Sequence, residues 1–138
     1  MDFVFEMKPF VKQSTNFGKG RAFTAPHIRH AMDYIQEMAS EEMTRNGWKM
    51  FDPDVALRCE VTAHLIRPSA HFNKKGVLKD SAPAHHLKRP DTSNLIDKPV
   101  VDALNGVCFM DDSQLVTLVY RKRFDTFEGY TVNLKEEK

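Results

Sequence analysis

Residues 89–114 have the sequence RPDTSNLIDKPVVDALNGVCFMDDSQ, and the predicted fold is built around this stretch. A short segment with periodic apolar residues lies between an Arg-Pro-Asp opening and a closing acidic pair. Soluble domains seldom gather many carboxylates around one short helix unless these bind a cation or are widely solvated. The stretch contains the following carboxylates: Asp91, Asp97, Asp102, Asp111 and Asp112.

The apolar positions of this stretch predict a helix that begins near residue 93 and ends before Asn105-Gly106. At 1.5 Å per residue such a helix is roughly 18–20 Å long, so Asp91 and Asp112 on either side of it are not automatically close. They meet if the segment carrying Asp91 and the strand that starts near Gln114 are neighbours in the sheet. The two carboxylates would then repel unless a cation lay between them, and hard oxygen ligands of this kind suit Mg²⁺ or Mn²⁺.

Hydrophobic periodicity outside this stretch predicts strands at 3–8, 55–66, 114–124 and 130–134, and an amphipathic helix at 26–45. The element order is therefore β-α-β-α-β-β. We expect an α/β protein of the α+β kind, with one mixed four-stranded sheet and two helices on one of its faces. The length of 138 residues predicts a single domain over 1–138.

Two long loops, at 9–25 and 67–88, contain much of the positive charge. The formal net charge is only +1, so no global basic field indicates nucleic acid. In the first loop, however, Phe17 and Phe23 alternate with basic residues, a mixture suited to phosphate contact and base stacking. The candidates for phosphate contact are Lys8, Lys12, Lys19, Arg21, Lys88 and Arg89.

The cysteines and histidines predict no metal or disulfide framework. Cys59 and Cys108 have apolar surroundings and are interpreted as small buried hydrophobes. The histidines of the 67–88 loop lack the ligand spacing of a zinc site, and His64, on the polar side of a strand, is expected at the surface. No apolar run is long enough to span a bilayer and the N-terminus is acidic, so we expect an intracellular, cytoplasmic protein.

The central stretch resembles the signature of the RusA family of Holliday junction resolvases, which is roughly K-P-D-x-D-N-L-x-K-x-x-x-D-A-L-N-G followed by D-D-x-Q-V. The opening segment KPFVKQSTNFGKGRAFTAP is similar to that of the phage-type members, and the resemblance covers nearly the whole chain. The resemblance implies a homodimeric, Mg²⁺-dependent endodeoxyribonuclease. Such an enzyme cuts four-way DNA junctions by paired symmetric nicks in DNA recombination and repair.

The resemblance also implies roles for individual residues. The first catalytic, metal-binding aspartate of the family falls on Asp91 and the third on Asp112, whereas the second falls on Ser93, which carries no charge. The chain is one residue longer than the pattern after Asn94, so the family's lysine corresponds to Lys98 or to Asp97, depending on the direction of counting.

Pro99 follows at once, and a proline inside a helix costs about 3 kcal/mol or more. We therefore expect an irregularity at 93–97 and a regular helix from residue 98 or 99. Such a bulge would turn Asp97 toward the metal in place of the missing carboxylate, while Lys98 would offset phosphate charge. In contrast, Asp102 is interpreted as a helix-surface residue and Asp111 as a turn former.

Three functions fit the sequence. The first is a metal-dependent endonuclease selective for branched DNA. The second is a non-catalytic protein of the same fold that binds branched DNA and has lost cleavage through Ser93. The third, a small metal- or protein-binding domain without a DNA role, requires the motif similarity to be accidental.

Overall fold

The computed structural model describes residues 1–12, 16–18, 21–23 and 25–138, and side chains outside 13–24. Its main sheet has the order β1-β6-β4-β5, in which β4 and β5 are parallel and the other neighbours are antiparallel. The prediction of one mixed four-stranded sheet in an α+β fold is confirmed. The strands of this sheet are β1 (Asp2–Glu6), β4 (Leu57–Ile66), β5 (Leu115–Asp125) and β6 (Gly129–Glu136).

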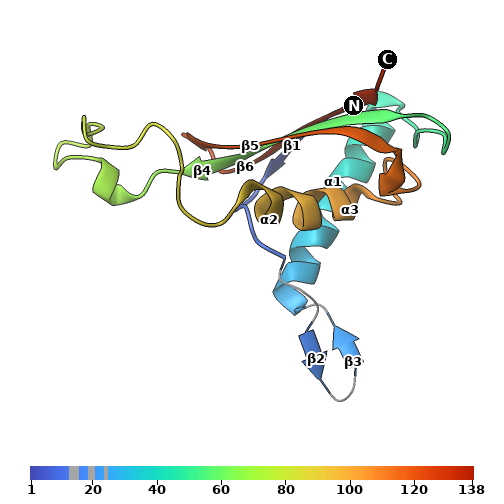
Figure 1. Cartoon of the computed structure of the whole chain (residues 1–138), viewed down its shortest axis with the longest axis horizontal. Coiled ribbons are helices and arrows are strands. Elements are labelled where there is room, and N and C mark those ends of the chain that lie inside the picture. The colour runs from blue at the N-terminus through green and yellow to red at the C-terminus, as the bar shows by residue number, and fades with distance from the viewer. Residues whose placement is uncertain (13–15, 19–20, 24) are drawn as a thin grey trace.

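The helices cover one face of this sheet (Figure 1). The longest, α1 (Pro26–Asn46), begins with a proline that needs no helical N–H donor and ends at Gly47, whose φ of 68° is left-handed. The second helical segment on this face spans 92–104 and consists of α2 (Thr92–Ile96), a π-helical turn η2 (Asp97–Val101) and α3 (Asp102–Leu104). Two short 3₁₀ turns, η1 (Ser69–His71) and η3 (Asp112–Gln114), complete the helical elements.

The segment at 9–25 is not a plain loop. Its backbone forms an antiparallel hairpin of β2 (Asn16–Gly18) and β3 (Arg21–Phe23), which projects away from the sheet beside the start of α1 (Figure 1). This hairpin was not predicted, because each of its strands has three residues, too few to show an alternating pattern in the sequence.

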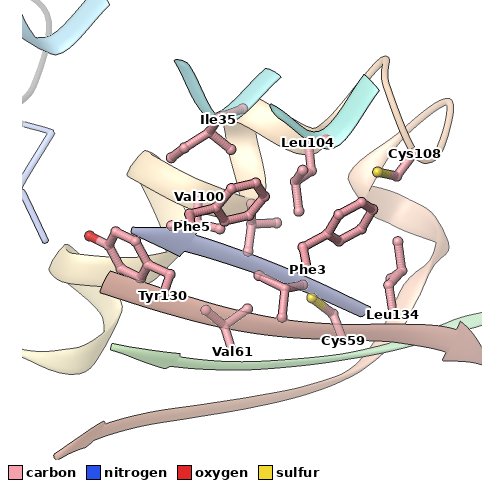
Figure 2. Close-up of a cluster of buried hydrophobic side chains, with 14 of the residues drawn as sticks. Phe3, Phe5, Ile35, Cys59, Val61, Val100, Leu104, Cys108, Tyr130 and Leu134 are labelled. Atoms are coloured by element: carbon pink, nitrogen blue, oxygen red, sulfur yellow. The ribbon is translucent and has the colours of Figure 1, made fainter. Parts of the chain in front are cut away.

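The core lies between the sheet and the helices (Figure 2). Alternate strand residues such as Phe3, Phe5 and Val61 face it, and Ile35 of α1 and Leu104 of α3 close it from the other side. Both cysteines are buried there as predicted, and burial raises the pKa of each thiol to about 12, so both stay protonated. The periodicity that predicted the strands therefore also identified their buried face.

The opposite face of the sheet carries the polar residues of β4, with one difference from expectation. His64 is buried, with 7% of its surface exposed, although it was expected at the surface. Its Nδ1 lies 2.9 Å from Asp125 Oδ2 and its Nε2 lies 2.9 Å from Thr131 Oγ1, while Phe127 packs against the ring. These partners come from β5 and β6 and the turn between them, so no local pattern around His64 could have predicted its burial.

No helix in the described part of the chain is both long enough and apolar enough to cross a membrane.

Candidate active site

An irregularity was expected at 93–97, but that stretch is α-helical, and the irregularity is instead a π-helical turn at 97–101. The N–H of Asp102 bonds the carbonyl of Asp97, five residues back, whereas Asp97 itself bonds Ser93 in the usual α-helical way. A π turn inserts one residue into an α-helix, which accounts for the extra residue relative to the family pattern. The helix already begins at Thr92, so the expectation of a start at residue 98 or 99 was wrong.

Tyr130 donates a hydrogen bond to the helical carbonyl whose usual N–H partner is missing at Pro99. In a regular helix the carbonyl of Leu95 would accept the N–H of the residue four positions on, but that residue is Pro99 and has none. The Tyr130 hydroxyl instead donates a 2.8 Å hydrogen bond to Leu95 O. Tyr130 thereby ties the helical segment to β6, and burial raises the pKa of its hydroxyl so that it remains a donor.

Asp97 points toward β5, where the hydroxyl of Tyr120 donates a 2.8 Å hydrogen bond to its Oδ1. Burial, followed by this hydrogen bond, raises the pKa of Tyr120, which therefore stays protonated. Asp97 is half-buried, and its second oxygen has no hydrogen-bond partner among the described residues. The π turn thus fixes the direction of the carboxylate that was expected to replace the one missing at Ser93.

Asp102 lies one π turn further along, and Lys12 is its ion-pair partner, with Nζ 3.8 Å from Oδ2. Partial burial raises the pKa of Asp102, the charge of Asp97 adds to the rise, and Lys12 and Lys98 oppose it. Side chains five residues apart share a face only where the helix is widened in this way. A periodicity of 3.6 residues gives no sign that Asp97 and Asp102 are neighbours.

The pair Asp111 and Asp112 sits in the link before β5. The interaction between these two neighbouring carboxyls raises the pKa of Asp112 and lowers that of Asp111, so the pair holds one proton more tightly than separate carboxyls would. The charges of Asp102 and Asp97 add to the rise at Asp112. The α3 end of the helical segment therefore brings Asp97, Asp102 and Asp112 into one electrostatic neighbourhood.

Gln114 fixes the position of this pair and was not among the predicted site residues. It is 6% exposed, its Nε2 donates to the carbonyls of Asp52 and Val55, and its Oε1 accepts the N–H groups of Met110 and Asp111. A glutamine three residues after a turn-forming aspartate is the pattern of a capping box, which was available in the sequence.

Asp91 lies at the opposite end of the helical segment. Its side chain is exposed and makes no capping hydrogen bond, although its carbonyl accepts the N–H of Leu95 at 3.0 Å. Lys122 of β5 holds the preceding residues, because its Nζ donates to Lys88 O at 2.8 Å and to Pro90 O at 3.1 Å. Lys88 and Arg89 are themselves exposed beside Asp91.

The two ends are well separated within one chain. Figure 1 shows α2 on the side of the 67–88 segment and the orange turn that carries Asp112 at the other end of α3. The 92–104 segment between Asp91 and Asp112 is roughly 20 Å long at 1.5 Å per residue. Across residues 1–12, 16–18, 21–23 and 25–138, no group of three or more His, Cys, Asp or Glu side chains is placed to hold a metal ion.

The residues expected to contact DNA fall into three groups. Lys88 and Arg89 lie at the Asp91 end, and Lys12 lies at the Asp102 end, where Lys98 is exposed on the helix. Lys8 is exposed just after β1. Lys19 lies outside the described residues, and of Arg21 only the backbone, in β3, is described.

Comparison with protein families supports the resemblance seen in the sequence. The model of the endodeoxyribonuclease RusA family matches residues 6–135. The chain belongs to the RusA family. It is therefore a member of a family of Holliday junction resolvases, which are endodeoxyribonucleases whose substrate is branched DNA. A search of curated proteins found no match.

Membership of the RusA family removes the reading in which the motif similarity was accidental. The match includes both ends of the 92–104 segment, the π turn between them and the hairpin at 16–23. Residues at both ends thus belong to one family domain, although they are far apart in a single RusA chain.

Proposed function

We propose that this RusA-family protein is a Mg²⁺-dependent homodimeric resolvase that cuts four-way DNA junctions by paired symmetric nicks. The observation that carries the proposal is the group of carboxylates at the α3 end: the neighbouring pair Asp111 and Asp112, with Gln114 bonded to the backbone of Asp111, and Asp97 and Asp102 near enough for their charges to raise the pKa of Asp112. Carboxylates that repel one another in this way favour the uptake of a proton or the binding of a cation.

The residues at the Asp112 end fit Mg²⁺ better than a metal that needs a full protein cage. Mg²⁺ in nucleic-acid enzymes is held by one or two carboxylates, and waters and substrate phosphates complete its octahedral shell. Asp112 would supply one ligand, and the unbonded oxygen of Asp97 is available as a second. Mn²⁺ has the same preference for oxygen ligands and would substitute for Mg²⁺.

Bound Mg²⁺ would neutralise charge on the phosphodiester and favour a hydroxide nucleophile at neutral pH. Lys98, exposed beside Asp102, is placed to offset the charge that develops on the phosphate. Lys8, Lys88 and Arg89 would neutralise backbone phosphates and position the junction without reading its sequence.

We propose that Asp91 completes the site across the dimer. Two symmetric nicks call for two symmetric sites, and a two-fold axis places the same surfaces of two chains against each other. Because the 92–104 segment separates Asp91 from Asp112 within one chain, the homodimer is the arrangement in which Asp91 of one protomer reaches Asp112 of the other. The exposed apolar residues at the start of β5, Val116 and Leu118, and Met110 before it, offer surface for such a contact.

Cleavage of a synthetic four-way junction with and without Mg²⁺ tests the function directly. Metal-dependent nicks at symmetric positions in opposite strands are expected. Within this assay, Asp97→Asn should reduce nicking, while Tyr120→Phe, which frees Asp97 Oδ1, should leave more activity than Asp97→Asn does. Full activity of Asp97→Asn would remove Asp97 from the metal site.

A second candidate function is branched-DNA binding without cleavage. The observation in its favour is Ser93, which lies in the first turn of α2 where the family pattern has a carboxylate. This reading predicts junction binding but no nicking by the natural sequence, and recovery of Mg²⁺-dependent nicking by Ser93→Asp. Nicking by the natural sequence would rule it out.

A further inference from the structure

A cavity of about 260 Å³ lies between the 67–88 segment and the end of β5. We define it as the Phe124 pocket, after the residue of β5 in its wall. The rings of His71 and His86 approach Phe124 edge-on, with centroids 5.3 and 5.4 Å from that of Phe124. Leu87 and Lys88 also line the pocket, and Leu87 is 85% exposed.

The residues that line the pocket suit a planar ring with polar atoms at its edge, carried by a negatively charged molecule. Its wall consists of an aromatic ring, imidazoles, aliphatic groups and a lysine, and no carboxylate is among the described residues that line it. His86 Nδ1 is buried and has no hydrogen-bond partner in the described part of the chain, an arrangement that proteins usually avoid. Burial, and then the charge of Lys122, lowers the pKa of His86, so the ring is available in its neutral form.

The pocket is tied to the candidate catalytic residue Asp91. Lys122 and Phe124 are two residues apart on β5 and therefore point to the same face of the sheet. The ammonium of Lys122 holds Lys88 and Pro90 by their carbonyls, so the rim of the pocket and the residue before Asp91 are fastened to the same strand. Lys88 and Asp91 are three residues apart, which is at most about 10 Å of extended chain.

We propose that the Phe124 pocket receives one unstacked base of branched DNA, whose sugar-phosphate backbone then passes Lys88 and Arg89 toward Asp91. This inference rests on the proposed function, because it takes branched DNA as the substrate. Aromatic side chains bind exposed bases of any sequence by stacking, and nearby cations bind the adjacent phosphates. Bases at a branch point leave the stack at lower cost than those within a duplex, since their stacking is interrupted on the side of the branch point.

The first experiment measures binding of a four-way junction in EDTA, over a series of salt concentrations. Phe124→Leu should bind about 5- to 150-fold more weakly than wild type, the range expected for loss of one aromatic–base stack. Leu87→Ala, which removes an apolar side chain from the pocket wall, should also bind more weakly. Their log–log salt dependence should be unchanged, because no phosphate contact is lost. Leu87 is so exposed that its truncation spares the fold, and Val77→Ala, at an exposed apolar residue of the same segment outside the pocket, is the matched control.

The second experiment locates the base. A junction with 5-iodo-2′-deoxyuridine at its branch point should crosslink on irradiation to a peptide from 67–88 or β5. Affinity equal to wild type in both variants, or a crosslink confined to other peptides, would overturn the pocket while leaving the resolvase proposal intact. If wild type bound no junction at all, the proposed function itself would fail.

Discussion

The two ends of the 92–104 helical segment are built differently. At the α2 end, the Asp91 side chain is exposed and makes no capping hydrogen bond, with Lys88 and Arg89 beside it. At the α3 end, Asp112 lies next to Asp111, whose backbone N–H donates to the buried Gln114 side chain. One end presents a single carboxylate next to cations, and the other holds carboxylates in fixed positions. In the proposed function each end is half of a metal-dependent nuclease site, which makes the pairing of ends from two protomers the central claim.

The largest effect is expected from removing either half. Asp91→Asn and Asp112→Asn should each abolish Mg²⁺-dependent nicking of a four-way junction, because each removes a metal ligand that the other end does not replace. Junction binding in EDTA should persist in both variants. Asp54→Asn, an exposed carboxylate in the turn before β4, is the matched control and should cut like wild type. Normal cleavage by Asp91→Asn would break the comparison, since the α2 end would then have no catalytic part.

Gln114→Leu should have the next largest effect, confined to the α3 end. It leaves the carbonyl of Val55 and the N–H groups of Met110 and Asp111 without their Gln114 partner, at a cost of about 1–3 kcal/mol in the free energy of unfolding. The carbonyl of Asp52 loses one of its two bonds and still accepts the N–H of Val55. Because Gln114 positions the acidic pair, affinity for Mg²⁺ should also fall roughly 10- to 100-fold, as for other residues that orient ligands. Chemical denaturation and calorimetric titration with Mg²⁺ measure the two effects, and unchanged Mg²⁺ affinity in a folded variant would show that Gln114 does not position the site.

How far the sequence predicts this molecule also differs between its parts. Alternation of apolar residues in β4 identified a strand and its buried face, because period-two burial is a local property. The contact of Asp97 with Tyr120 and the ion pair of Asp102 with Lys12 depend on a π turn and on distant elements, so no local pattern contains them. The extra residue and Pro99 indicated that the helix is irregular, but the predicted position, 93–97, was wrong, because the π turn lies at 97–101.

Acid should destabilise the fold through a carboxylate at the end of β5, the strand that also carries Lys122. The backbone N–H of Thr126, followed by the hydrogen bond from His64, lowers the pKa of Asp125, the last residue of β5. A carboxyl with a lowered pKa stabilises the fold above its ordinary pKa of 3.8, and this contribution is lost as the pH falls through the lower value in the folded state. Below about pH 4, the melting temperature of wild type should therefore fall more steeply with decreasing pH than that of Asp125→Asn. Parallel curves of melting temperature against pH would contradict this role of Asp125.

The smallest effect is expected for Lys12→Ala. Its ion pair with Asp102 is partly exposed, so the free energy of unfolding should change by about 0–1 kcal/mol. If Lys12 also contacts a phosphate, the slope of log affinity against log salt for junction binding should become shallower by about 0.9. Glu6→Gln, at an exposed residue at the end of β1, is the surface control. An unchanged slope for Lys12→Ala would show that Lys12 contacts no phosphate and interacts only within the protein.

The most direct test of the central claim is a mixed dimer of Asp91→Asn and Asp112→Asn, purified through a different affinity tag on each chain. If each site takes Asp91 from one protomer and Asp112 from the other, the mixed dimer holds one site with both mutations and one intact site. It should then nick one strand of a four-way junction in Mg²⁺, although neither variant alone cuts. A mixed dimer that binds the junction but is as inactive as its parents would contradict the account.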